Sequence, residues 1–380
     1  MANGTRVGSI DFWRGGVLIA ILVDHVPGNV LESLTPRNFG LSDSSEAFVF
    51  LSGLSVGMVY LPRARKNGLA AVARGCLQRA LKLYSVHVAL TFAALAIFAC
   101  AWWMSGVDDL ITAHGRSFVF SSPATGLAGL TLLSHQLGYF NILPLYIVLM
   151  LWAPLALAIA MRDPRAALLT SVVVYAASRV VGLHLPNWPE PGAWFFNPFA
   201  WQLVFTIGLV CAVVWRNAAP RPSAALIALC LVTILMSTLV TTSAAGFAPG
   251  LREAVSSHLD LAKQDLGLAR LAHFIALAYL IAVAPWLARV VEGTLGRAVQ
   301  SLGRNGLTIF ATGSIFSALG QAGLGALSPY ASEGVERLAG LAYTVVGVAA
   351  LFAIARWIEC RNPRAPKGPL FASSAAPQPL

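Results

Sequence analysis

The chain has 380 residues, of which 57% are hydrophobic and only 11% are charged. So little polar surface cannot coat a water-soluble globule of this size, which excludes a soluble enzyme and indicates an integral membrane protein. The net charge of +10 does not indicate nucleic-acid binding, because the basic residues sort by side of the membrane.

About ten apolar stretches approach the roughly 20 residues that a bilayer-spanning helix needs. We therefore predict an all-α, polytopic membrane protein with about ten transmembrane helices, forming one domain over residues 1–360. Residues 361–380, rich in Pro, Ala and Ser, are predicted to be a disordered cytoplasmic tail. The apolar stretches lie near residues 15–31, 46–61, 83–104, 141–161, 166–183, 199–215, 223–243, 271–290, 304–324 and 337–355.

The distribution of Lys and Arg predicts the orientation of these helices. If both termini face the cytoplasm, most basic residues fall on the cytoplasmic side, which is the positive-inside pattern and favours an even number of spans. The outside loops then keep only Arg37, Arg116, Arg252, Lys263 and Arg270.

The first apolar stretch, DFWRGGVLIAILVDHVPGN, contains Asp11, Arg14, Asp24 and His25. On an ideal helix Arg14 and His25 share nearly the same face, about 16 Å apart along the axis. Ionisable groups inside a span are costly and usually face a polar cavity, so a functional site is expected here. An imidazole titrates near neutral pH, which makes His25 a candidate proton acceptor, although a buried histidine that only bonds to a neighbour is the alternative. Pro27 is expected to kink this helix.

The second stretch, FGLSDSSEAFVFLSGLSVGMVY, places Asp43 and Glu46 at the outer end of a span. These carboxylates fit either the rim of a sugar site or solvated loop charges. Gly53 and Gly57 form a small-xxx-small face, which predicts close helix packing.

The segment PRARKNGLAAVARGCLQRALKLY, residues 62–84, carries basic residues among small and apolar ones. This pattern suits an amphipathic helix at the cytoplasmic interface. Charge that only sets the membrane topology is the simpler interpretation for any one of these residues.

Aromatic and amide side chains gather where later spans begin. They suit the faces and hydroxyls of a sugar, but they are also typical of an interfacial aromatic belt. The aromatic and amide residues that gather where later spans begin are His135, Tyr139, Asn141, Trp188, Trp194, Phe195, Phe196, Asn197, Trp201 and Gln202.

Lys263 and Arg270, near the start of the eighth span, fit either a substrate carboxylate or a lipid headgroup. The five cysteines form no CxxC pair, so neither a disulfide framework nor a metal site is predicted.

Six blocks of the sequence together resemble those of one protein family: SIDFWRGGVLIAILVDHVPGN, FGLSDSSEAFVFLSG, YFNILPLYIVLMLWAPL, WFFNPFAWQLVF, LARLAHFIALAYL and LGRNGLTIF. From Ile10 to about Ala355 the chain resembles the OpgC-type glucan succinyltransferases of the bacterial inner membrane, within the acyltransferase 3 group of membrane acyltransferases. The spacing of Arg14 and His25 matches that of the broader group.

The resemblance implies transfer of an acyl group from a cytoplasmic acyl-CoA, succinyl-CoA above all, to hydroxyls of osmoregulated periplasmic glucans. His25 would move the proton, and Arg14 would lie on the CoA side. The thioester is already activated, so no metal is required. The expected catalytic residues are His25, Arg14 and Asp24; the expected CoA-binding residues are Arg14, Arg74, Arg79 and Lys82; and the expected glucan-binding residues are Asp43, Glu46, Trp194, Asn197 and Gln202.

Two other functions fit the same residues. A proton-coupled secondary transporter would use Asp24 and His25 as a proton relay, although no two-fold repeat of spans is visible. A non-catalytic membrane partner of the glucan machinery would not need His25. The expected partners are the glucan and membrane lipid, and a homo-oligomer is left open. The sequence does not distinguish direct transfer from transfer through an acyl-histidine intermediate.

Overall fold

A computed structural model describes residues 8–215, 220–242, 255 and 258–361. Within these residues the regular elements are helices and no strand is present, although Pro186 and Ala193 form one isolated antiparallel bridge. The predicted all-α class is confirmed for this part of the chain. Beyond its first residue, the predicted tail 361–380 lies outside the described residues.

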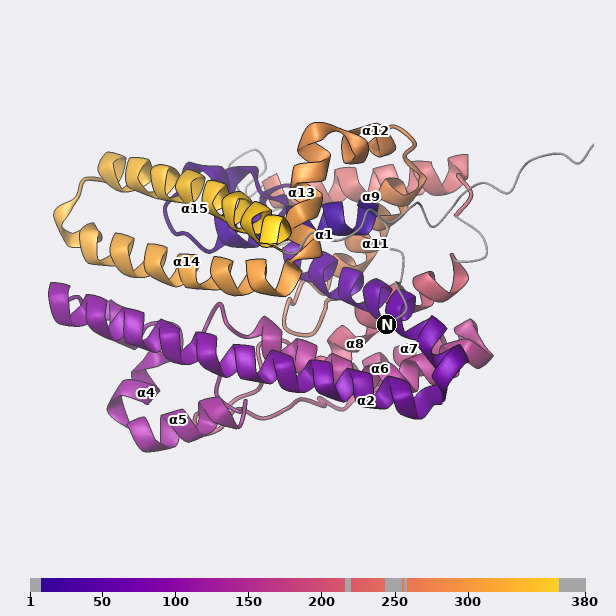
Figure 1. Ribbon diagram of the computed structural model, residues 1–380, viewed down its shortest axis with the longest axis horizontal. Helices are drawn as coiled ribbons and strands as arrows, with labels where there is room; N and C mark the ends of the chain where they lie inside the picture. The colour runs from indigo at the N-terminus through magenta and orange to yellow at the C-terminus, as the bar shows by residue number, and fades with distance from the viewer. Residues whose placement is uncertain (1–7, 216–219, 243–254, 256–257, 362–380) are drawn as a thin grey trace, which may run out of the picture.

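The bundle consists of long helices joined by shorter ones (Figure 1). The long helices are α1 (Gly8–Asp24), α2 (Ser44–Ser105), α6 (Ile142–Arg162), α7 (Pro164–Val180), α8 (Pro198–Val214), α9 (Ala224–Thr242), α11 (Leu268–Val283), α13 (Thr294–Arg304), α14 (Gly306–Leu327) and α15 (Glu333–Arg361). The shorter elements are η1 (Val30–Leu34), η2 (Pro36–Asn38), α3 (Asp109–Thr112), α4 (Arg116–Ser121), α5 (Pro123–Thr131), α12 (Leu287–Glu292) and η4 (Ser328–Tyr330).

Each predicted apolar stretch overlaps one of the long helices. Of the helices described, five are long and apolar enough to cross a membrane: α2, α6, α9, α14 extended through η4, and α15. The apolar helices α8 and α11 are shorter. These helices indicate a membrane protein, and the number of about ten spans stays a prediction.

Helix α2 is two helical arms joined at Gly68. The backbone there has φ 76° and ψ 172°, a conformation that favours glycine because side chains with a Cβ rarely adopt it. Residues 62–84, predicted as one interfacial helix, are therefore divided between the two arms. The break lets α2 supply both the second and the third predicted apolar stretch.

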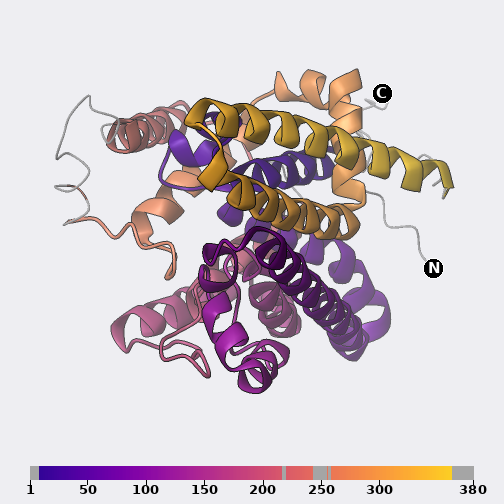
Figure 2. The ribbon, with the colours of Figure 1, turned by 90° about the vertical axis from the view of Figure 1, so that its left-hand side faces the viewer.

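Helix α1 lies between two groups of helices (Figure 2). On one side it packs against α13, α14 and α15, and on the other side against α2. Helix α2 in turn packs against α6 and α8, and α7 covers α8. In Figure 1, α14 and α15 run side by side along one edge of the molecule.

The contact between α2 and α8 depends on glycines in both helices. A Cβ added at Gly53 would overlap the carbonyl oxygen of Phe205, and one added at Gly208 would overlap that of Phe50. Gly57 also faces α8 at close range. Small residues allow helix backbones to approach closely in lipid, so the predicted packing role of Gly53 and Gly57 is confirmed.

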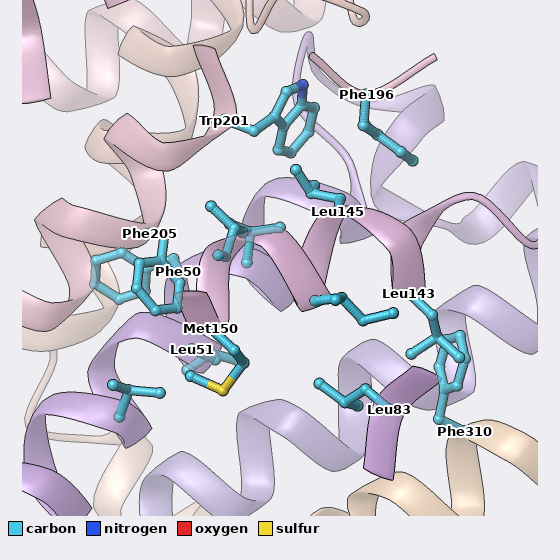
Figure 3. Close-up of a cluster of buried hydrophobic side chains, with 14 of the residues drawn as sticks. Phe50, Leu51, Leu83, Leu143, Leu145, Met150, Phe196, Trp201, Phe205 and Phe310 are labelled. Carbon is cyan, nitrogen blue, oxygen red and sulfur yellow. The ribbon is translucent and has the colours of Figure 1, made fainter. Parts of the chain in front are cut away.

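Around this contact lies a core of large side chains (Figure 3). Trp201 and Phe205 of α8, Leu145 and Met150 of α6, and Leu83 of α2 are fully buried. Because lipid tails are as apolar as these side chains, van der Waals packing rather than exclusion from water holds such helices together. The core therefore fixes α2, α6 and α8 as one framework.

Two regions are more ordered than the sequence indicated. The segment between α2 and α6, predicted as a polar outer loop, contains α3, α4 and α5. Between α11 and α14 the chain forms α12 and α13, and α13 packs closely on α1. Both regions contact the residues of the candidate site.

Replacement of Gly53 by Ala is expected to lower the thermal midpoint of the purified protein in detergent. The added Cβ would collide with the Phe205 backbone, and overpacking of this kind costs about 1–3 kcal/mol. Gly313→Ala in α14 is the matched control, because nothing lies within 4 Å of a Cβ added there. Equal losses in both variants would show that the α2–α8 contact is not the reason.

Candidate functional site

Arg14 lies where α1, α2 and α13 meet. Its guanidinium lies 3.3 Å from Asp11 Oδ1 and donates to the carbonyl oxygen of Gly303 at 3.3 Å. A further hydrogen bond reaches Ser55 Oγ of α2. Across from it, a Cβ added at Gly306 would lie 3.0 Å from Arg14 Cδ. Arg14 thus joins three helices beside the first residue of α14, while 23% of its side chain stays exposed.

His25 is the first residue beyond α1, at the opposite end of that helix. Its carbonyl oxygen accepts a hydrogen bond from Gln321 Nε2 of α14 at 3.0 Å. Its imidazole packs edge-on against the Tyr139 ring, with 4.7 Å between ring centroids. Within the described residues the imidazole makes no hydrogen bond. Helix α14 therefore follows α1 from Arg14 at one end to His25 at the other.

The first helix ends at Asp24, so the predicted span to residue 31 is too long and Pro27 does not kink it. The Asp24 carboxylate accepts a hydrogen bond from Thr35 Oγ1 at 2.6 Å, and the Asn29 side chain donates to the carbonyl oxygens of Val23 and Val26. No hydrogen bond joins Asp24 to His25 in the described part of the chain. Asp24 thus holds the loop that follows α1, and its predicted catalytic role stays a prediction.

Two basic and two acidic side chains pair near His25. Lys263 Nζ lies 2.5 Å from Asp43 Oδ2, and Arg270 Nη2 lies 3.2 Å from the same oxygen and 2.7 Å from Glu46 Oε1. Glu46 has no exposed side-chain surface, whereas Asp43 keeps 14%. This cluster of two basic residues and two carboxyl groups, the Asp43 cluster, ties α2 to the start of α11.

The same residues begin α2. Asp43 caps the helix by accepting a hydrogen bond from the Ser45 N–H at 2.8 Å, and Glu46 accepts one from the Asp43 N–H at 2.9 Å. This is a capping box, which satisfies backbone donors at the helix start. Burial alone would raise the pKa of Asp43, but the positive charges of Lys263 and Arg270 hold it well below its usual range.

A small cavity opens beside the Asp43 cluster. Its volume of about 80 Å³ accommodates several waters or one small polar group. Burial has the largest effect on the pKa of His25, and the charges of Lys263, Asp43 and Arg37 also act on it, so His25 lies within reach of this charged region. The cavity is lined by Arg37, Gly40, Leu41, Ser42, Asp43, Thr241, Leu261 and Arg270.

Trp194, Asn197 and Gln202, the other predicted glucan-binding residues, are buried and engaged with the protein. Asn197 caps α8 through the Phe199 N–H and donates to Asp265 at 2.9 Å. The Gln202 side chain exchanges hydrogen bonds with Ser171 of α7. These contacts join α7, α8 and the segment before α11, and glucan binding by the three residues stays a prediction.

The predicted CoA-binding residues other than Arg14 lie on the second arm of α2. Arg74 and Lys82 are exposed and Arg79 is half-buried. None of the three forms an ion pair with any described residue. They are therefore free to meet phosphates, which a guanidinium contacts through two hydrogen bonds at once.

Some neighbours of His25 were not apparent from the sequence. Gln321 lies in an apolar stretch with no special pattern, and His114 lies in a segment expected to be a loop. Tyr139 was predicted only as one of many aromatic residues that suit either a sugar or an interfacial aromatic belt. Among the described residues, no group of three or more His, Cys, Asp or Glu side chains is arranged to hold a metal ion.

Comparison with known proteins gives one result. Residues 6–362 match the family model described as OpgC protein. No curated protein and no solved structure is matched by the chain. The matched range contains Arg14, His25 and all the helices described above.

Replacement of Asp43 by Asn is expected to destabilise the protein near neutral pH by about 1–3 kcal/mol, because it leaves charged partners without their carboxylate. The pKa of Asp43 is lower in the folded than in the unfolded protein, where it is about 3.9. The stabilisation is therefore present above about pH 4 and is lost as the pH falls below it. Thermal midpoints of both proteins between pH 7 and pH 3 measure the difference.

Glu333→Gln is the matched control, because Glu333 and Arg337 form an exposed pair with 78% and 62% of their side chains accessible. Such a pair contributes about 0–1 kcal/mol. A difference between wild type and Asp43→Asn that stays constant down to pH 3, or a control that loses as much, would contradict the role of the Asp43 cluster.

Proposed function

Because the chain belongs to the OpgC family, we propose that it transfers a succinyl group from cytoplasmic succinyl-CoA to hydroxyls of osmoregulated periplasmic glucans. Membership of this family indicates a transferase that modifies such glucans. The apolar helices indicate a membrane protein, and the bacterial inner membrane, with both termini in the cytoplasm, is the location that this reaction needs.

The state of His25 is the observation that carries the proposed chemistry. The other ionisable residues of the candidate site are engaged: Arg14 joins three helices, Asp24 binds Thr35, and Asp43 pairs with two cations. The imidazole of His25, by contrast, has no hydrogen bond to the described residues. A general base needs a free nitrogen within hydrogen-bond reach of the substrate, and His25 meets the first of these conditions.

In the proposed reaction His25 carries the proton from the sugar hydroxyl to the leaving group. As the hydroxyl oxygen of the sugar attacks the thioester carbonyl, an imidazole nitrogen takes its proton, an effect typically worth about 10² to 10⁴ in rate. An ester C–O bond forms, the C–S bond breaks, and the proton passes from His25 to the CoA sulfur. Direct transfer is the simpler form, because it needs no covalent enzyme intermediate.

The two ends of α1 fit the two substrates. Arg14 and His25 lie about 16 Å apart along the helix axis, and α14 borders both. We place the CoA end at Arg14, which contacts Ser55 of α2, and the acceptor end at His25. The long pantetheine arm of CoA would cover the distance between them.

Family membership does not favour the transporter alternative. The relay that it requires would pass a proton between Asp24 and His25. In the structure the Asp24 carboxylate instead accepts a hydrogen bond from Thr35.

Succinyl transfer is tested with the protein in liposomes, with succinyl-CoA on the cytoplasmic-facing side and the glucan on the other. Wild type is expected to add the succinyl mass to the glucan, measured by mass spectrometry, and His25→Ala is expected to lose at least about 100-fold in rate. His184→Ala is the matched control, because that imidazole faces Asp265 and Asn197 instead.

Two outcomes of this assay would contradict the proposal in different ways. A wild type without transfer would mean that the donor, the acceptor or the reaction class is wrong. A His25→Ala variant as active as the control would show that the proton acceptor is another group.

Binding of CoA by the second arm of α2 is tested by changing Arg74, Arg79 and Lys82 together to Gln. Loss of three cations is expected to raise the KM for succinyl-CoA about tenfold or more with little change in kcat, because their contact with phosphate is the same in ground and transition states. Added salt should reduce the difference. Arg63→Gln, whose guanidinium lies over the Tyr60 ring, is the control, and an unchanged KM in the triple variant would reject this site.

A further inference from the structure

Three rings from separate segments meet at the end of α1. The His25 imidazole packs edge-on against Tyr139, at 4.7 Å between centroids and 69° between planes. The Tyr139 ring packs in the same way against His114, at 4.9 Å and 61°. Tyr139 is thus the central ring of a row that begins at the candidate base.

The backbone places two of these three rings at an energetic cost. His114 has φ 56° and Tyr139 has φ 71°, in the left-handed region that residues with a side chain rarely occupy. The Gly138 N–H donates to the carbonyl oxygen of His114 at 2.9 Å, which fixes the two segments together. Conformations of this kind persist where the surroundings enforce them, and they concentrate at functional sites.

Burial does not account for this arrangement. Tyr139 keeps 37% of its surface exposed, and His114 is exposed. The segment that carries His114 is instead anchored by its neighbour Arg116, which is buried, lies 3.9 Å from the Phe98 ring centroid and donates to the carbonyl oxygen of Asp109. A firmly held segment therefore presents rings that remain open to solvent.

The chemistry of the row suits a sugar. A pyranose ring has apolar faces of C–H groups that pack on aromatic rings, and its hydroxyls need hydrogen-bond partners at the ring edge. A phenol and two imidazoles supply both kinds of contact. His25, at one end of the row, places a nitrogen base beside a sugar that lies on Tyr139.

We infer that Tyr139 and His114 form the acceptor-binding surface, on which a glucose unit of the glucan stacks so that one of its hydroxyls reaches His25. This inference rests on the proposed function for the identity of the acceptor. It adds a binding surface that is separate from the Asp43 cluster and from the buried residues Trp194, Asn197 and Gln202.

The first test measures binding of purified osmoregulated periplasmic glucan to the full-length protein in nanodiscs, by calorimetry without acyl-CoA. Tyr139→Ala is expected to weaken binding about tenfold, and His114→Ala by a smaller factor, through loss of stacking. Tyr139→Phe keeps the ring and should remain within about threefold of wild type. Tyr330→Ala is the matched control, because Tyr330 is 77% exposed between α14 and α15, and it should bind as wild type does.

The second test compares KM and kcat for the glucan in the transfer assay. A binding surface predicts that Tyr139→Ala raises KM with a small effect on kcat. A fall in kcat with unchanged glucan affinity would show that Tyr139 only orients His25, and would overturn the inference. Unchanged binding and kinetics in Tyr139→Ala would overturn it as well.

The two tests separate this inference from the proposed function. If wild type binds the glucan through Tyr139 but transfers no succinyl group, the surface stands and the donor is wrong. If wild type transfers succinyl groups and the Tyr139 variants match it, the function stands and the surface is wrong. If wild type does not bind the glucan at all, the surface is rejected.

Discussion

The cost of keeping ionisable side chains among apolar helices governs the arrangement around α1. A charge inside such a bundle requires a partner, and each partner here also connects two parts of the chain. Arg14 joins α1 to α2 and α13, and the Asp43 cluster joins the start of α2 to the start of α11. Charge pairing therefore positions the helix ends near His25, and the His25 imidazole is left without a hydrogen bond among the described residues.

Much of the fold follows from simple patterns in the sequence. Apolar stretches predicted the long helices, because length and hydropathy are local properties of the chain. The packing of Gly53 and Gly57 was also predictable, since small residues at this spacing have few other uses in a span. Helix α13 was not predicted, because its apolar residues lie on one face only and its partner, α1, is far away in the sequence.

The candidate site was predictable only in part. The helical repeat relates Arg14 to His25, because both belong to the same stretch. It does not reveal that Gln321 reaches the His25 carbonyl oxygen, or that Tyr139 packs on the ring. Those contacts depend on where α14 and the loop before α6 are placed. Asp43 and Glu46 were identified as outer carboxylates, but their cationic partners are more than 200 positions away.

The central claim is that the thioester of the donor meets the acceptor hydroxyl beside His25. A cryo-EM structure of the protein with a non-hydrolysable thioether analogue of succinyl-CoA and the glucan tests this most directly. The account predicts the adenine nucleotide at the Arg14 end and the acyl carbon about 3–4 Å from a sugar oxygen that contacts His25. An acyl group bound elsewhere, with no sugar near His25, would contradict it.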